Sequence, residues 1–327
     1  MEARELINRY NAGERDFKGV NLMGANLERA KLPGINLSDA YLGAVNLSRA
    51  NLKGANLTRT YLFRADLNCA KVHEASLTQA DLTKANLQGA YFVKSILKDA
   101  KLSGARLNHV NLRQANLTGV NLCGANLQGI NFRSANLKDV NLSWANLSGA
   151  RLSGANFQGA TLNGVKLSGA YMNGVDLHGV DLDGVNLSNA KISGANLSET
   201  NLSVANLSDT QLRTVFMSRA NLHAANLQGA NLLRAGLCEI DFSKADLTEA
   251  RLEKADLTGA NLNKACLVDT NLRQASLRNA YLWGATLQNV DFADTNLSGA
   301  NFRGAHWAEV DWQLAILEEA TLPEGVR

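Results

Sequence analysis

Three features of the sequence are of types that could carry chemistry: five histidines, four cysteines and a glycine-rich run from Gly164 to Gly184. Histidine and cysteine can ligate metals or act as nucleophile and base, provided that the side chains converge within a few ångströms. Glycine-rich loops can hold phosphate groups when a helix N-terminus follows them. The residues are His73, His109, His178, His223 and His306, and Cys69, Cys123, Cys238 and Cys266. Which of them can meet depends on the elements that carry them.

A strict five-residue period dominates the chain. From Phe17 to Leu322, all 62 positions counted in steps of five hold Leu, Phe, Met, Ile, Val or Trp, without insertion or deletion. Two residues before each later central position, from Val20 to Ala320, stands Ala, Val, Ile, Thr or Ser. This period matches neither a helix nor a strand. It predicts one elongated repeat domain, although 327 residues would ordinarily form two or three domains.

Many units read Ala-Asn-Leu followed by two variable residues, as at Ala25–Leu27, Ala55–Leu57 and Ala195–Leu197. The run resembles the pentapeptide-repeat family, whose consensus is A(D/N)LXX, and the cyanobacterial type in particular. The resemblance implies an all-β fold, a right-handed quadrilateral β-helix in which four pentapeptides form one coil with the central and small residues inside. Substitutions at the Asn/Asp position leave the period intact, so we expect them to alter the surface only. They include Lys71, Ile96, Phe216, Gly236 and Cys266.

Three segments follow from the pattern. Residues 1–14 are predicted to form an N-terminal capping helix, because Ala3, Leu6, Ile7 and Tyr10 make an apolar stripe at helical spacing. Residues 15–322 are predicted to form the β-helix of about 15.5 coils, which is 62 pentapeptides at four per coil, and residues 323–327 a short tail. Frequent glycine two residues after the central position indicates corner turns with positive φ. No apolar run approaches 18 residues, so we expect no membrane span, no signal peptide and a cytoplasmic location.

The C-terminal end carries the bulkiest inward residues. Trp307 and Trp312 occupy central positions and are expected to plug the last coil, while Pro323 discourages pairing of its edge. Leu314 and Ile316 should face outward. They either cover this end locally, which predicts a monomer, or support an end-to-end dimer.

With coils of 20 residues, the side chains that could do chemistry are kept apart. We name each face of the coil by its first central residue: Phe17, Leu22, Leu27 and Leu32. The four cysteines point outward too far from one another to form a disulfide, no two histidines lie within a coil of each other on one face, and no helix follows the glycine-rich run. A filled interior also leaves no concave pocket. We therefore expect no enzyme, no cofactor, no metal and no small-molecule substrate.

Charge is segregated by face. The Leu32 face has 13 basic and five acidic outward residues, a balance of +8, whereas the Phe17, Leu27 and Leu22 faces carry −4, −3 and +1. Either this is a solvated face, or it binds a protein with an acidic surface. Arg113, Arg133 and Arg151 are the best candidates for binding, because no acidic residue neighbours them on that face. Elsewhere on it we expect Glu74 to lie beside Lys94, and Glu253 beside Arg273.

A second candidate lies on the Leu22 face, where Met23, Tyr41, Tyr61 and Phe63 occupy consecutive coils. These side chains either form a ladder that stabilises the N-terminal coils or form a recognition patch.

Function is the least determined property. We favour a non-catalytic scaffold that presents flat charged faces to a protein partner. The alternatives are a DNA-mimicking modulator of gyrase, as in one branch of the family, and nucleic-acid binding by the basic face. The net charge of +3 and the absence of loop insertions disfavour the first alternative, and the scarcity of aromatic residues on the basic face disfavours the second.

Overall fold

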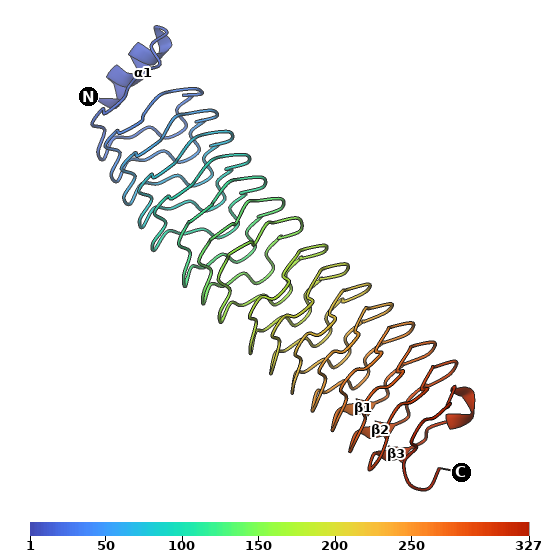
Figure 1. Cartoon of the computed structure of the whole chain (residues 1–327). Helices are drawn as coiled ribbons and strands as arrows, with labels where there is room; N and C mark the ends of the chain where they lie inside the picture. The colour runs from blue at the N-terminus through green and yellow to red at the C-terminus, as the bar shows by residue number, and fades with distance from the viewer. Residues whose placement is uncertain (327) are drawn as a thin grey trace. The chain divides into compact units, whose positions relative to one another are not determined.

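The chain forms two compact units in the computed structural model, which describes residues 1–326. The first spans Met1–Leu162, and the second begins at Asn163. In each unit successive coils of the chain lie one above the next (Figure 1). Arg327, the last residue of the predicted tail, lies outside the described residues.

Parallel pairing between residues 20 apart builds both units. In the first unit Asp16 pairs with Asn36, which pairs with Asn56, and in the second Asn186 pairs with Asn206. Pairs of this kind recur at five-residue intervals along most of each unit, which gives the coils four sides. Most sides pair through a single residue before the chain turns, and the strands long enough to name are β1 (Cys266–Val268), β2 (Thr286–Gln288) and β3 (His306–Ala308).

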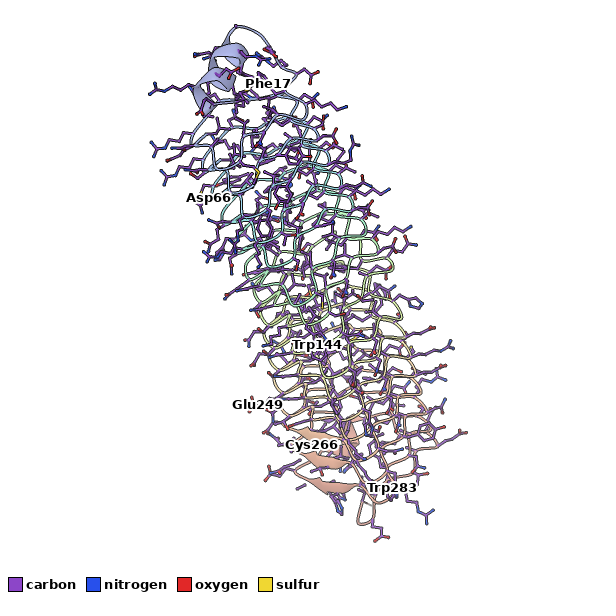
Figure 2. The ribbon with its side chains drawn as sticks, turned by 90° about the vertical axis from the view of Figure 1, so that its left-hand side faces the viewer. Phe17, Asp66, Trp144, Glu249, Cys266 and Trp283 are labelled. Atoms are coloured by element: carbon purple, nitrogen blue, oxygen red, sulfur yellow. The ribbon has the colours of Figure 1, made fainter. Side chains whose placement is uncertain are left out.

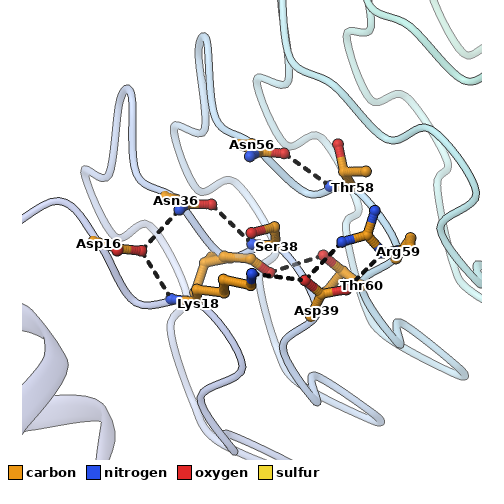
Figure 3. Close-up of polar contacts among 10 residues, drawn as sticks. Asp16, Lys18, Asn36, Ser38, Asp39, Asn56, Thr58, Arg59 and Thr60 are labelled. Atoms are coloured by element: carbon orange, nitrogen blue, oxygen red, sulfur yellow. Dashed lines mark hydrogen bonds and ion pairs between the residues drawn. The ribbon is translucent and has the colours of Figure 1, made fainter.

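Every backbone N–H of a typical pentapeptide has an acceptor, which explains why the pattern is so strict. In the unit 36–40 the N–H of Asn36 donates to Arg15 O at 2.8 Å, Leu37 to Asn56 O at 2.8 Å, Asp39 to Thr58 O at 3.0 Å, and Ala40 to Leu37 O at 3.1 Å. The N–H of Ser38 donates to Asn36 Oδ1 at 3.1 Å (Figure 3). Three of these bonds join neighbouring coils, one closes the corner turn, and one uses a side chain.

That side-chain bond gives the Asn/Asp position a structural role. Its Oδ1 accepts the N–H of the residue two places later, an Asx turn that recurs along both units. The expectation that substitutions there alter only the surface was wrong for this reason. Where Tyr281 replaces Asn, the N–H of Trp283 is accepted by Asn263 of the preceding coil instead, at 2.8 Å.

The corners adopt the left-handed conformation that the glycines indicated. The residue two places after the central one has positive φ throughout, from Gly19 to Glu319, except at Leu314, which lies in the 3-10 helix η1 (Trp312–Leu314). At most corners the N–H of the next residue closes the turn by donating to the carbonyl of the central residue, and positive φ at the third position is typical of a type II turn. Many of these residues are not glycine, including the β-branched Val204 and Thr214 with φ of 47° and 53°.

The interior is filled by the central and small residues. Every central position from Phe17 to Phe302 is buried, and so is Trp312. Six small positions carry a buried hydroxyl that donates to a backbone carbonyl, such as Thr60 to Leu37 O at 2.9 Å and Thr295 to Leu272 O at 2.7 Å. These hydroxyls are therefore satisfied without water.

The last coil departs from the prediction that every central position is buried. Trp307, Leu317 and Leu322 are only half-buried, because no further coil covers them. Trp312 does plug this end, with its ring centroid 5.5 Å from that of Phe292 and 5.2 Å from that of Phe302. Outward-facing Leu314 and Ile316 are exposed, as expected, and Pro323 is buried.

At the N-terminus, the helix α1 (Ala3–Asn11) lies against the first coil (Figure 1). Leu6 and Tyr10 of its apolar stripe are buried, and the Tyr10 hydroxyl donates to Pro33 O at 2.7 Å. Among the described residues, no helix has the length and apolarity needed to cross a membrane.

Candidate functional site

The thiols and imidazoles are dispersed, as the register predicted. The four cysteines are free and partly or fully exposed. Within residues 1–326, His, Cys, Asp and Glu side chains nowhere form a group of three that could hold a metal ion. Burial, together with a hydrogen bond to the Asp256 carboxylate at 3.1 Å, raises the pKa of the Cys238 thiol to about 11. A thiol with so high a pKa is a poor nucleophile.

The basic charge of the Leu32 face lies mostly in the first unit. There seven basic residues face one acidic residue, Glu74, whereas the second unit has six basic and four acidic residues. The basic residues of the first unit are Lys31, Lys53, Lys71, Lys94, Arg113, Arg133 and Arg151; those of the second are Lys191, Arg213, Arg234, Arg251, Lys254 and Arg273.

The ion pairs on this face differ from those expected. Glu74 pairs with Lys53 at 3.8 Å and not with Lys94. Glu253 pairs with Arg251 of its own coil at 2.9 Å, leaving Arg273 to pair with Asp291 at 3.6 Å. The sequence register identified the correct face but not the coil of each partner, because the rotamers of long side chains decide which of several nearby partners is taken.

Arg113, Arg133 and Arg151 lie on three successive coils of the first unit, and all three are exposed. The N–H groups of Arg113 and Arg133 are each held at 3.2 Å by the asparagine two residues earlier, Asn111 and Asn131. These asparagines are themselves joined, Asn131 Nδ2 to Asn111 Oδ1, at 3.2 Å. None of the three arginines forms an ion pair with any of residues 1–326. The backbones are thus fixed while the guanidinium groups stay available.

His73 lies on the same face, 5.9 Å from the ring of Tyr91 between centroids. Burial lowers its pKa from the ordinary value, and nearby Lys53 and Lys71 act in the same direction, against the opposing effect of Glu74. This imidazole is therefore neutral near pH 7 and adds no charge to the basic face.

The aromatic strip on the Leu22 face comprises Met23, Tyr41, Tyr61 and Phe63. The rings of Tyr61 and Phe63 stack with centroids 6.0 Å apart, and Tyr41 pairs with Tyr61 through the backbone. A Cβ added to Gly43 would lie 2.9 Å from the Tyr61 ring and 3.3 Å from Met23 Cε. The strip is therefore one packed patch in which Gly43, a residue not singled out from the sequence, leaves room for its neighbours.

Sequence reasoning did not single out two exposed apolar side chains of this face, Trp144 and Val204. Trp144 is 70% exposed, and it occupies a left-handed corner with φ of 62° (Figure 2). Val204 and Trp283 are exposed on the same face in the second unit. The five-residue register could have predicted this exposure, because each of these residues lies one or two positions after a central residue of the Leu22 face.

Several solved structures are similar to this chain. HetL, a pentapeptide repeat protein involved in heterocyst differentiation regulation in the cyanobacterium Nostoc sp. strain PCC 7120, is 28% identical, with 89% of this chain and 96% of that one covered and a TM-score of 0.19. Rfr23, a pentapeptide repeat protein from the cyanobacterium Cyanothece 51142, is 24% identical, with 51% and 96% covered and a TM-score of 0.13. A trypsin-treated form of QnrB1, a plasmid-mediated fluoroquinolone resistance protein, is 17% identical, with 64% and 89% covered and a TM-score of 0.32.

No functionally curated protein matches the chain. The family model of pentapeptide repeats in eight copies matches in overlapping segments that together cover residues 16–324. The period, the inward residues and the coil pairing of both units agree with that match. The chain therefore belongs to the pentapeptide repeat family, whose fold is a right-handed β-helix.

Proposed function

We propose that this protein is a non-catalytic scaffold that uses the Leu32 face of its first unit to bind a protein partner with an acidic surface. Proteins of this family are structural repeat scaffolds. The observation that carries the proposal is the presence of Arg113, Arg133 and Arg151 on successive coils, exposed and without an ion pair among residues 1–326.

Two physical properties of these arginines favour a protein partner. A guanidinium group can donate two parallel hydrogen bonds to a carboxylate, and it is less strongly hydrated than a lysine ammonium. Their backbones are fixed by the coil, so binding would order only the side chains and would lose less entropy than ordering a loop. Such a surface suits rapid, salt-dependent association with an acidic partner.

The two alternatives have weaker support. Nucleic-acid binding by this face would need aromatic rings on which successive bases could stack. Its exposed tyrosines, Tyr91 and Tyr171, are too few for this and are separated by several coils. Modulation of gyrase by DNA mimicry would need an acidic surface, which the Leu32 face does not provide. A DNA supercoiling assay with added protein tests this alternative, because inhibition would support it.

We further propose that the protein acts as a monomer in the cytoplasm. Four free cysteines suit a reducing compartment.

Affinity capture from the native cell tests the scaffold proposal. The bait is the full chain, compared with the triple variant Arg113→Glu, Arg133→Glu, Arg151→Glu. Lys98→Glu with Lys138→Glu serves as the matched control, since both lysines are exposed on the Phe17 face of the same unit. We expect the triple variant alone to lose a specific partner. Identical captured proteins for all three baits would refute the proposal.

A further inference from the structure

A shallow hollow on the Leu22 face of the second unit combines two aromatic rings with hydrogen-bond donors. It has a volume of about 390 Å³ and is lined by Asn263, Tyr281, Trp283, Asn301 and Arg303. These residues come from three successive coils, because the backbone pairs join positions 261, 281 and 301. Figure 2 labels Trp283 near the C-terminal end of the second unit.

The rings are held by their surroundings but remain accessible. Tyr281 and Trp283 are 54% and 50% exposed. Lys264 Nζ lies over the Trp283 ring, 4.8 Å from its centroid. A Cβ at Gly304 would lie 3.4 Å from Trp283 Nε1, so glycine lets the indole lie close to the next coil. The site therefore presents a fixed aromatic surface beside a cation.

The polar groups of the hollow are mainly donors. Asn263 Oδ1 accepts the N–H of Trp283 at 2.8 Å, and Asn301 Oδ1 accepts the N–H of Arg303 at 3.0 Å. Their carbonyl oxygens are used in this way, and the NH₂ group of each amide adds two hydrogen-bond donors. No carboxylate lines the hollow, and within residues 1–326 Arg303 has no ion pair, including with Glu324 of the next coil. This arrangement is complementary to an anion attached to an apolar group.

We propose that the hollow, which we call the Trp283 site, binds an acidic segment of a protein partner. An apolar side chain of that segment packs against Tyr281 and Trp283, and its carboxylates accept hydrogen bonds from Arg303 and Lys264. The proposal rests on the scaffold function and adds a second binding surface to it, on another face and in the other unit than Arg113, Arg133 and Arg151.

Two observations favour a protein over a nucleotide or a nucleic-acid strand. Small-molecule sites bury most of their ligand, whereas rings that are half exposed on a shallow surface need a partner large enough to cover them. A strand would need rings on successive coils, yet the preceding coils of this face present Asp241, Ser243 and Asn261. Tryptophan, tyrosine and arginine are also the residues that dominate protein interfaces energetically.

The indole N–H signal of Trp283 in the full-length ¹⁵N-labelled protein reports on the site, once it has been assigned with Trp283→Phe. Four probes are titrated: the peptide Asp-Glu-Phe-Glu-Asp with blocked ends, the neutral Asn-Gln-Phe-Gln-Asn, the ring-free Asp-Glu-Gly-Glu-Asp, and adenosine monophosphate. We expect the first peptide to shift the Trp283 signal at the lowest concentration and each of the other probes to need about tenfold more. No shift with the acidic aromatic peptide, or an equal or stronger response to any other probe, would overturn the proposal.

Two variants locate the interaction. Arg303→Gln should weaken binding of the acidic aromatic peptide about tenfold, whereas Trp144→Ala, which removes an exposed tryptophan of the same face in the first unit, should leave it unchanged. An unchanged affinity of Arg303→Gln would overturn the proposal. Because this test does not involve Arg113, Arg133 or Arg151, its failure would leave the scaffold proposal standing, and capture by the triple variant tests that separately.

Discussion

The inward and outward columns of the coil obey different rules, although they alternate within five residues. Inward positions accept only residues that fit a closed interior, and the central residues are buried until the last coil. Outward positions accept charged, aromatic and apolar residues, including Arg133 and Trp144. Comparing the two regions separates what specifies the fold from what is free to specify function, and each prediction below tests that separation.

The largest effect is expected inside the coil. Ala225 is buried with 1% exposure, so Ala225→Leu should overpack the interior and lower the free energy of unfolding by about 1–3 kcal/mol. Its neighbour Ala224 is exposed, and Ala224→Leu should change stability by less than about 0.5 kcal/mol. Chemical denaturation of both variants measures this, and equal destabilisation would contradict the assignment of inward and outward positions.

The Asn/Asp position, directly before the central residue, combines properties of the inward and outward positions. Asn116 Oδ1 accepts bonds from the backbone N–H of Thr118 at 3.1 Å, from its hydroxyl at 2.7 Å, and from Asn136 Nδ2 at 3.3 Å. Removing this acceptor with Asn116→Ala should lower the free energy of unfolding by about 1–2 kcal/mol. The control is Gln114→Ala, on an exposed side chain that has no hydrogen bond among the described residues. Similar melting temperatures for the two variants would show that the side chains at the Asn/Asp position do not stabilise the fold.

Much of this organisation could be predicted from the sequence, because it depends on backbone periodicity. The register placed Leu37 inside, assigned Arg113 and Arg133 to one face, and indicated positive φ at corners such as Gly24. It could not predict the role of Asn36 Oδ1, since only the folded turn brings that oxygen to the N–H of Ser38. It also could not predict the ion pairs, because they depend on side-chain rotamers. Nor could it predict the partial exposure of Trp307, which arises because no further coil covers that residue.

A smaller, stabilising effect is expected at the corners. Val204 is an exposed β-branched residue with φ of 47°, a conformation that glycine adopts without strain. The relief of about 1–2 kcal/mol is partly offset by about 0.5–1 kcal/mol of glycine chain entropy, so Val204→Gly should raise stability by up to about 1.5 kcal/mol. Val93→Gly is the matched control, at an outward valine outside the left-handed corners, and should lower stability. Calorimetry that shows both variants destabilised would refute strain at Val204.

The smallest effect concerns pH. The pKa of His73 is lowered in the folded state, so the folded protein binds this proton less readily than the unfolded chain. The contribution of His73 to stability is therefore complete above about pH 6.5, the ordinary histidine value, and is lost as the pH falls toward the lowered pKa. NMR titration should give His73 a midpoint below 6.5, and His73→Gln should flatten the pH dependence of stability below about pH 6.5. A midpoint at or above 6.5 would contradict this.

The central claim, that the Leu32 face of the first unit binds an acidic protein, is tested most directly by the salt dependence of affinity. The captured partner is purified, and its dissociation constant is measured at low and high salt for the wild type, for the Arg113→Glu, Arg133→Glu, Arg151→Glu variant and for the Lys98→Glu, Lys138→Glu control. Exposed charges are screened within about 10 Å at 0.1 M salt. We predict affinity that weakens steeply with salt for the wild type and the control, and little binding at any salt for the triple variant. Equal affinities and equal salt dependence for all three proteins would contradict the claim.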